Sequence, residues 1–261
     1  MGGALDKFRR FVLGQLDQLG ALLLLFFDIV RTTFTNRPRW TETIDQTYKI
    51  GWKSQLVVLI TGAFTGMVFA VQTYQQFHKV KMDTAVGPVV SVAMTRELAP
   101  VLTALMVAGR VGAAIAAELG TMKVTEQLDA LRSFGTAPVD FLAVPRFLAL
   151  LLALPLLTAE AMFFGIFAGY FVGVYMCGID QAYYVENMVK LTAAKDVTSG
   201  LIKSVFFAMF IALISTYKGF NAGEGAEGVG KATTEAVVVS SLTVLIANFF
   251  IAVLFNAITP S

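Results

Sequence analysis

Long apolar stretches separated by short polar ones run through the chain, and their length predicts membrane-spanning helices. About 20 predominantly apolar residues are needed to cross the hydrocarbon of a bilayer. Five stretches reach that length, at approximately residues 56–77, 86–119, 141–177, 197–217 and 236–258. The second and third are longer than a bilayer requires, so we expect these helices to tilt, kink or project beyond the membrane.

The first apolar stretch, residues 19–27, is too short to span. It covers roughly half of the length needed, and Asp28 and Arg31 close it. We expect it to form a helix that lies in the membrane interface. The residues that follow, up to Lys53, are polar. The sequence therefore predicts a cytoplasmic or interfacial N-terminal helical segment, residues 1–53, and a five-helix transmembrane domain, residues 54–261.

Composition agrees with an all-α integral membrane protein and narrows its chemistry. Of the 261 residues, 56% are hydrophobic and 15% are charged, and the mean hydropathy is +0.70. A soluble globule could not cover that much apolar surface. The single cysteine, Cys177, excludes an intramolecular disulfide, and the single histidine, His78, cannot build the usual kind of metal site. With no carboxylate cluster and no Ser/His or Cys/His set, an intramembrane enzyme is disfavoured, and we expect neither catalytic nor metal-binding residues.

The distribution of basic residues predicts the orientation in the membrane. Eight Lys and Arg residues precede the first span, three lie between the second and third spans, and two lie between the fourth and fifth, whereas the alternate loops carry four. Cytoplasmic loops are enriched in Lys and Arg. This bias of 13 to 4 places the N-terminus in the cytoplasm and, with five spans, the C-terminus outside.

Residues 225–235, GAEGVGKATTE, have the glycine and lysine spacing of a phosphate-binding loop. However, Ala232 stands where a Ser or Thr would bind magnesium, and the stretch is confined between two predicted spans. We therefore expect a flexible cytoplasmic loop that contacts a partner, and not a nucleotide site.

The second predicted span carries two adjacent charges, Arg96 and Glu97, shortly before Pro100. A charge in hydrocarbon costs about 2.5 kcal/mol or more, so such residues normally face the protein interior or a wet cavity. At 1.5 Å per residue from Val86, the two charges lie roughly 15 Å along the helix. Pro100 has no N–H to donate to the carbonyl of Arg96, so we expect a kink or a freed carbonyl at this point.

Helical spacing groups other polar residues into stripes. Arg96, Thr103 and Arg110 recur every seven residues and predict one polar stripe, with Glu97 about 100° away. A mixed stripe on the first span consists of Phe69, Thr73, Gln76 and Phe77. These stripes suit either ordinary helix packing or a cavity for acyl chains below a polar headgroup.

Three further charged residues lie within predicted spans. Asp196 and Lys203 are seven apart at the outer end of the fourth span. This charged membrane pair predicts a cross-helix ion pair or a charged lining, with structural use favoured. Glu160 is surrounded by apolar residues in the third span, and the sequence indicates neither its partner nor its purpose.

Residues 119–138 predict a short cytoplasmic helix at about residues 123–135. Its apolar positions recur at helical spacing and are Val124, Leu128, Leu131 and Phe134. Thr125 is expected to cap its start, and Gly135 with Pro138 to end it. The apolar face suits either contact with the chain's own membrane domain or lipid, or docking into a groove of a cytoplasmic partner.

A resemblance to a known family is carried by SVAMTRELAPVLTALMVAGRVGAAIAAELGTMKVTEQLDAL, together with ATTEAVVVSSL near the end of the chain. These stretches resemble the permease subunit of the bacterial ABC transporters that work with MCE-domain lipid-binding proteins, the maintenance-of-lipid-asymmetry type. The joint spacing of TREL, AGR, AELG and TEQL is specific, and the similarity covers nearly the whole chain. It implies a noncatalytic permease in the inner membrane that moves phospholipid between that membrane and a periplasmic MCE partner.

The resemblance also implies the partners. They are a second copy of the chain, a cytoplasmic ABC ATPase dimer that binds ATP and magnesium, a STAS-domain protein and a periplasmic MCE-domain ring. The permease itself carries no cofactor. By the same resemblance, the short cytoplasmic helix is the coupling helix that enters the ATPase, with Glu126, Gln127, Leu128 and Leu131 in the contact.

The resemblance places an outward-open lipid cavity at the dimer interface, with Arg96 and Glu97 in its lining. We expect Arg96 to attract the phosphate and Glu97 to balance that charge or pair with Arg96. The expected lipid contacts on the first span are Phe69, Thr73 and Phe77. Alternatively, Arg96 and Glu97 bond to neighbouring helices and only fix the kink. A scaffold that anchors the MCE ring and the ATPase without a cargo cavity is the alternative function.

Overall fold

The computed structural model describes residues 2–35 and 39–258, and within these two ranges the chain forms helices and no β-strand. The α-helices are α1 (Gly2–Thr35), α2 (Trp40–Lys79), α3 (Val86–Ala93), α4 (Ala99–Val107), α5 (Ala113–Val124), α6 (Gln127–Ser133), α7 (Val144–Phe171), α8 (Gln181–Leu191), α9 (Ala194–Phe220) and α10 (Gly225–Ile258). A short 3₁₀ turn covers Asp83–Ala85. The all-α membrane fold predicted from the sequence is confirmed.

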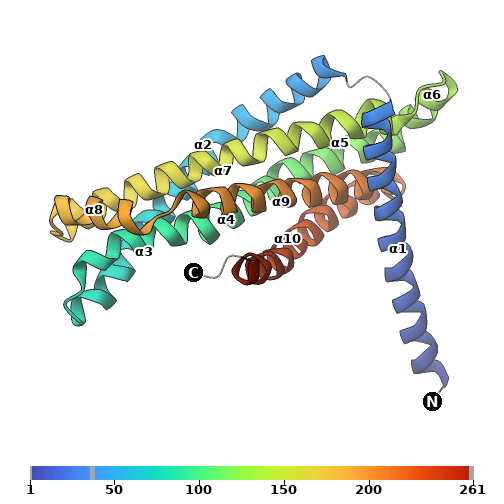
Figure 1. Ribbon diagram of the computed structural model, residues 1–261. Helices are drawn as coiled ribbons and strands as arrows, with labels where there is room; N and C mark the ends of the chain where they lie inside the picture. Colours follow the sequence, from blue (N-terminus) through green and yellow to red (C-terminus); the bar gives the residue numbers. More distant parts are fainter. Residues whose placement is uncertain (1, 36–38, 259–261) are drawn as a thin grey trace.

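Each of the five predicted spans is a helix or a run of consecutive helices. The spans correspond to α2, to α3 through α5, to α7 with its flanking turns, to α9 and to α10. α2, α7 and α9 lie side by side with the α3–α5 run, while α10 leaves the bundle at an angle (Figure 1). The connections are short, so the long helices pass from one end of the bundle to the other.

Helix α1 adds a sixth candidate span. Among the described residues, six helices are long and apolar enough to cross a membrane, and Leu16–Thr35 is one of them. Figure 1 shows α1 running across the end of the bundle that carries α6, and not alongside the other helices. Ile29, which is fully buried, and the ring of Phe26, 6.4 Å from the ring of Phe147, attach it there. Its interfacial position in a bilayer stays a prediction.

Two segments differ from the boundaries and loop expected from the sequence. α2 already begins at Trp40, so the predicted boundary near residue 53 falls inside one continuous helix. The stretch 225–235 forms the first turns of α10, so the prediction of a flexible loop is wrong. Its good helix formers allow the helix of the last span to extend back toward the N-terminus as far as Gly225. Gly225, with a φ of 69°, is the first residue of α10.

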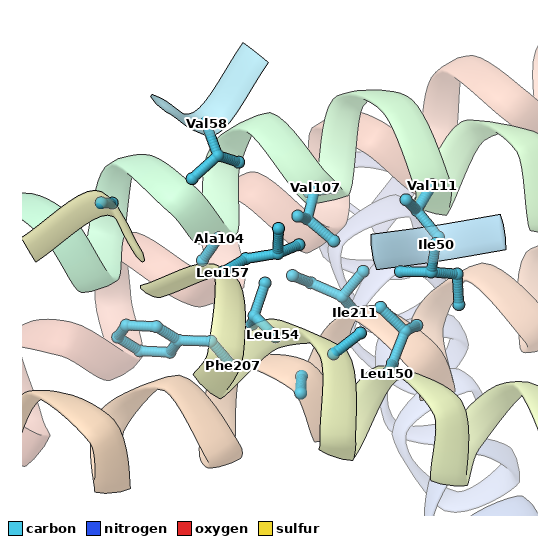
Figure 2. Packing of buried hydrophobic residues seen from close by; sticks show 14 of the residues in the cluster. Ile50, Val58, Ala104, Val107, Val111, Leu150, Leu154, Leu157, Phe207 and Ile211 are labelled. Carbon is cyan, nitrogen blue, oxygen red and sulfur yellow. The ribbon is translucent and has the colours of Figure 1, made fainter. Parts of the chain in front are cut away.

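Glycine allows α2 and α7 to pack with their backbones in contact. A Cβ on Gly62 would lie 2.9 Å from the carbonyl oxygen of Ala161, and one on Gly66 would overlap the backbone of Gly165. α4, the turn 108–112 that follows it, α7 and α9 close the core with branched side chains, among them Val107, Val111, Leu154 and Ile211 (Figure 2). Small residues one helical turn apart on α2 and α7 are therefore used for packing within one chain.

The spans are not uniform α-helices. π-helical turns interrupt or flank them at Met94–Leu98, Ala108–Gly112, Val139–Ala143 and Val172–Met176. Each π turn adds a residue to the helix and rotates the side chains that follow it, and such turns are common at functional sites. Two of them lie in the predicted second span, which carries Arg96 and Arg110.

Helix α8 is held against the opposite end of the bundle by Tyr184. This side chain is 1% exposed, and its ring lies 5.6 Å from that of Tyr170. Gly87 and Gly173 make room for it, because a Cβ on either would come within about 3 Å of the tyrosine. Burial raises the pKa of Tyr184 to about 12, so its hydroxyl stays neutral at physiological pH.

The α2–α7 contact predicts a strong effect of side-chain size. We expect Gly66→Leu to lower the midpoint of thermal unfolding of the purified protein by several degrees, because overpacking costs typically about 1–3 kcal/mol. The matched control is Gly109→Leu, whose new Cβ would meet nothing within 4 Å. Equal midpoints for the two variants would contradict the close approach of α2 and α7.

Candidate functional site

The adjacent charges Arg96 and Glu97 lie in the π-helical turn Met94–Leu98 and face helix α9. Arg96 donates from Nε to Oδ1 of Asp196 at 2.7 Å, and a second guanidinium nitrogen lies 2.6 Å from the same oxygen. The other carboxylate oxygen of Asp196 accepts the backbone N–H of Ala193, 2.9 Å away, at the start of α9. Asp196 therefore joins the charged turn to the beginning of α9.

Lys203, two turns further along α9, completes this arrangement. Its Nζ donates to Oε1 of Glu97 at 2.6 Å and to the backbone carbonyl of Arg96 at 3.0 Å. That carbonyl is the one to which Pro100, having no N–H, cannot donate. The sequence predicts a kink or a freed carbonyl at this point, and Lys203 provides this carbonyl with a donor.

Helix α10 supplies a partner that the sequence reasoning missed. Nδ2 of Asn248 donates to the second carboxylate oxygen of Glu97 at 2.9 Å. A lone asparagine in the strongly apolar stretch 236–258 was the available signal, because an amide in hydrocarbon needs a partner. We refer to Arg96, Glu97, Asp196, Lys203 and Asn248 as the charged cluster.

The charged cluster is balanced and only partly enclosed. Two acidic and two basic side chains make its formal charge zero, as isolated charges at membrane depth would be costly. The side chains of Asp196 and Lys203 are each 2% exposed, whereas those of Arg96 and Glu97 are 39% and 44% exposed. The α9 residues are therefore buried anchors, and Arg96 and Glu97 keep surface available for a ligand.

This geometry decides between several expectations from the sequence. Arg96 and Glu97 do not pair with each other, and Asp196 and Lys203 do not either; each residue of α9 forms an ion pair with the charged turn. Arg96 and Glu97 do bond to neighbouring helices, as the structural alternative required. Their exposed portions leave the lipid-binding hypothesis open.

The prediction of a single polar stripe is wrong. Arg110 turns toward α2 and donates to the hydroxyl of Ser54 at 2.7 Å, whereas Arg96 faces α9. Thr103, between them, is buried beside a narrow gap next to α2. A strict seven-residue repeat stays on one face only in a regular α-helix, and the two π turns rotate the residues out of line.

The three expected lipid contacts on α2 separate in the structure. Phe69 lines an open hollow of about 360 Å³ together with Leu98, the neighbour of Glu97. Thr73 is buried at 7% exposure, so it faces the protein, and Phe77 is half-buried near the end of the helix. Of the three, only Phe69 lies on a hollow that reaches the charged turn.

The expected coupling segment is shorter than predicted. α6 covers only Gln127–Ser133, and Glu126 begins it with a left-handed φ of 60°. Thr125 does not cap this helix, because Glu126 holds the N-cap position; the hydroxyl of Thr125 donates to the carbonyl of Thr121 at 2.8 Å. Gly135, with a φ of 72°, follows its end as expected.

The side chains of this segment divide into two groups. Leu128 is buried and Leu131 is half-buried, whereas Glu126 and Gln127 are exposed. Phe134 is 84% exposed. The segment therefore presents a polar tip and one aromatic ring at the end of the bundle, while its leucines hold it in place.

The ion pairs of the charged cluster predict a strong coupling between its members. Glu97→Gln leaves the buried ammonium of Lys203 without its counter-ion, and loss of one partner of a buried pair costs about 3–5 kcal/mol. We expect adding Lys203→Met to recover part of that loss in a double-mutant cycle measured by thermal unfolding.

The control for this cycle is the exposed pair Glu186 and Lys190 on α8, 2.6 Å apart. The same two substitutions there are expected to change stability little, because solvent screens exposed pairs. Additive effects of Glu97→Gln and Lys203→Met would show that the two side chains do not depend on each other.

Comparison with known proteins places the chain in a family. The family described as Permease MlaE matches residues 43–254. A probable ABC transporter permease protein of Rickettsia conorii is 44% identical over 239 residues, 92% of each chain. One of Synechocystis sp. is 44% identical over 210 residues, 80% of each chain.

A plant protein is also similar. Protein TRIGALACTOSYLDIACYLGLYCEROL 1, chloroplastic, of Arabidopsis thaliana is 37% identical over 227 residues, which cover 87% of this chain and 65% of the plant protein. The match to the family covers α2 to α10, which include the charged cluster and the segment around α6. The chain belongs to the MlaE permease family and is a multi-pass membrane permease of an ABC transporter.

Proposed function

We propose that this permease moves phospholipid between the inner membrane and a periplasmic MCE-domain partner, using ATP hydrolysed by a separate cytoplasmic ATPase. The observation that carries the proposal is the partly exposed pair of Arg96 and Glu97, held at membrane depth beside an apolar hollow. A phospholipid needs a cationic group for its phosphate and an apolar surface for its chains, and the two occur together here.

Arg96 is suited to the phosphate because Asp196 occupies only part of its guanidinium. Asp196 contacts Nε and one terminal nitrogen, and the side chain keeps 39% of its surface exposed. The remaining N–H groups provide donors for phosphate oxygens. Glu97 balances the local charge, and Phe69 offers an aromatic wall to the acyl chains, with Phe77 and Thr73 as the less accessible members of the same helix.

Transport requires two states that differ in affinity for the lipid. The charged cluster joins the α3–α5 run to α9 and α10 through side chains of three different elements. A movement of α9 or α10 would therefore alter the surroundings of Arg96 and Glu97 directly. We propose that the work for this movement enters through α6.

We propose that this ABC transporter permease works with a separate ATPase subunit, which would bind the ATP and magnesium; the family match and the permease names of the relatives support such a partner. The exposed Glu126 and Gln127 are the proposed contacts with the ATPase, and Leu128 and Leu131 support them from inside. We further propose a homodimer, a STAS-domain partner on the ATPase and an MCE ring outside. The basic bias supports a cytoplasmic N-terminus and a periplasmic C-terminus, and the plant relative's name, which contains that of a galactolipid, supports a lipid cargo.

The lipid contact predicts selective loss of bound phospholipid. We expect Arg96→Ala, Glu97→Ala and Phe69→Asp each to retain less phospholipid than the wild type in mass spectrometry of the purified protein. Arg96→Lys and Phe69→Leu are the matched controls, since they keep the charge and the apolar surface. If all three variants retain as much phospholipid as the wild type, Arg96 and Glu97 serve only to hold the helices together.

If α6 couples the permease to the ATPase, a substitution in this contact should reduce ATP hydrolysis while the permease and the ATPase still assemble. We expect Glu126→Lys to leave the ATPase bound in pull-down experiments but to reduce lipid-dependent ATP hydrolysis by at least about tenfold, the effect of losing about 1.4 kcal/mol of coupling. Glu186→Lys on α8, at the other end of the bundle, is the control. Loss of assembly alone would favour the scaffold alternative.

A further inference from the structure

A second polar hollow lies between α2 and α7, away from the charged cluster. It has a volume of about 210 Å³ and opens to the side of the bundle. Its lining comes from Thr47, Gly51 and Gln55 of α2 and from Ala153, Leu156, Leu157 and Glu160 of α7. Nothing in the charged cluster reaches it, because that cluster faces α9 and α10.

Glu160 brings an uncompensated carboxyl group into this hollow. Its Oε1 is buried and has no hydrogen-bond partner in the described part of the chain. None of the ion pairs formed between residues 39 and 258 includes it. An ionisable residue within a membrane helix normally has a partner or a function, and here the described residues supply the side-chain amide of Gln55 but no cation for the carboxylate.

The polar atoms around Glu160 make the hollow an acceptor site. Thr47 uses its own hydroxyl hydrogen to donate to the carbonyl of Thr43 at 2.8 Å, so its oxygen is left to accept. Gln55 offers a carbonyl oxygen as well as its amide. The lining contains no Lys or Arg. A phosphate would be repelled here, whereas a cation with several N–H donors would be matched.

Aromatic residues place the hollow near one surface of the membrane. Trp52 stacks on Tyr48 with ring centroids 6.3 Å apart, and it is 66% exposed. From Trp52 to Tyr74, α2 rises by roughly 33 Å at 1.5 Å per residue, close to the hydrocarbon thickness of about 30 Å. Trp and Tyr concentrate at membrane interfaces. Gln55 then lies about one turn inside the boundary nearest α6, within reach of lipid headgroups of that leaflet.

The walls of the hollow suit an amphiphile. Leu156 is 68% exposed at its rim, and Ala153 and Leu157 form its apolar floor. A small soluble cation would leave these surfaces uncovered. A lipid places its headgroup at the interface and its chains along the exposed leucine at the same time.

We propose that the hollow between α2 and α7 binds a phospholipid with a primary ammonium headgroup from the leaflet nearest α6, with the Glu160 carboxylate as counter-ion and Thr47 and Gln55 as hydrogen-bond acceptors. This site is separate from the proposed phosphate contact at Arg96, so it stands whether or not that contact carries cargo.

The test uses two variants of the full chain that act in different ways. Glu160→Gln removes the charge and keeps the shape. Gly51→Leu fills the hollow and keeps the carboxylate, because a Cβ on Gly51 meets nothing within 4 Å. Binding of phosphatidylethanolamine and of phosphatidylglycerol is measured by native mass spectrometry on the wild type, both variants and the control Glu186→Gln.

We expect the wild type and Glu186→Gln to bind one more phosphatidylethanolamine than either hollow variant, with an affinity at least about tenfold higher. Binding of phosphatidylglycerol should be equal in all four proteins, which also shows that the variants are folded. If millimolar ethanolamine competes with the lipid, the ammonium group alone is the ligand. If ethanolamine does not compete, the whole lipid is the ligand. In either case the ammonium group binds at Glu160.

Equal binding of phosphatidylethanolamine by the wild type and both hollow variants would overturn the proposal. A loss in Gly51→Leu with none in Glu160→Gln would also overturn it, because the hollow would then bind lipid without its counter-ion. Arg96→Ala, alone and combined with Glu160→Gln, serves as a separate arm. Arg96→Ala is expected to lose the phospholipid held at the charged cluster and to keep the additional phosphatidylethanolamine that Glu160→Gln removes, so failure of the transport proposal and failure of this one are distinguishable.

Discussion

The ammonium group of Lys203 holds together the part of this protein on which its function depends. It compensates Glu97 and at the same time satisfies the carbonyl that Pro100 leaves open at Arg96. Without it, the backbone carbonyl of Arg96 and the carboxylate of Glu97 would each lose a partner at membrane depth, where water cannot replace that partner. The lysine also fixes where α9 lies against the α3–α5 run. Asp196, on the same helix, likewise forms an ion pair with a residue of the charged turn, Arg96.

Two kinds of contact therefore organise the bundle, and they act on opposite sides of it. α2 and α7 meet through glycine and alanine, where backbone approach replaces side-chain interlocking. The α3–α5 run meets α9 and α10 through charged and amide groups. The glycine contact is short and rigid, whereas ion pairs can exchange partners when a phosphate or a second conformation competes for them. Under the proposed transport function, the exchangeable contacts lie at the proposed lipid contact of Arg96 and Glu97, where the surroundings must change between states.

The same division separates two kinds of polar chemistry. The charged cluster is neutral overall and offers a partly exposed guanidinium, while the hollow around Glu160 offers only acceptors. The first suits an anion and the second a cation. A phospholipid such as phosphatidylethanolamine carries both groups, so the two proposed sites would contact opposite charges of a zwitterionic headgroup at different places in the membrane. α6, at the end of the bundle, is the proposed point of contact with the ATPase.

The sequence by itself determined that the chain is an all-α membrane protein, which apolar stretches form long helices, which family it belongs to, and that Pro100 cannot donate to the carbonyl of Arg96. These follow from length, hydrophobicity and the covalent chemistry of proline, which are local properties. It did not determine the partners of Arg96 and Glu97, the role of Asn248 or the helical start of α10. The predicted polar stripe failed because π turns rotate side chains in a way that no heptad count contains. Only the tertiary structure decided which charges meet and that Oε1 of Glu160 is buried without a hydrogen-bond partner among the described residues, because residues about a hundred positions apart become neighbours only when the helices pack.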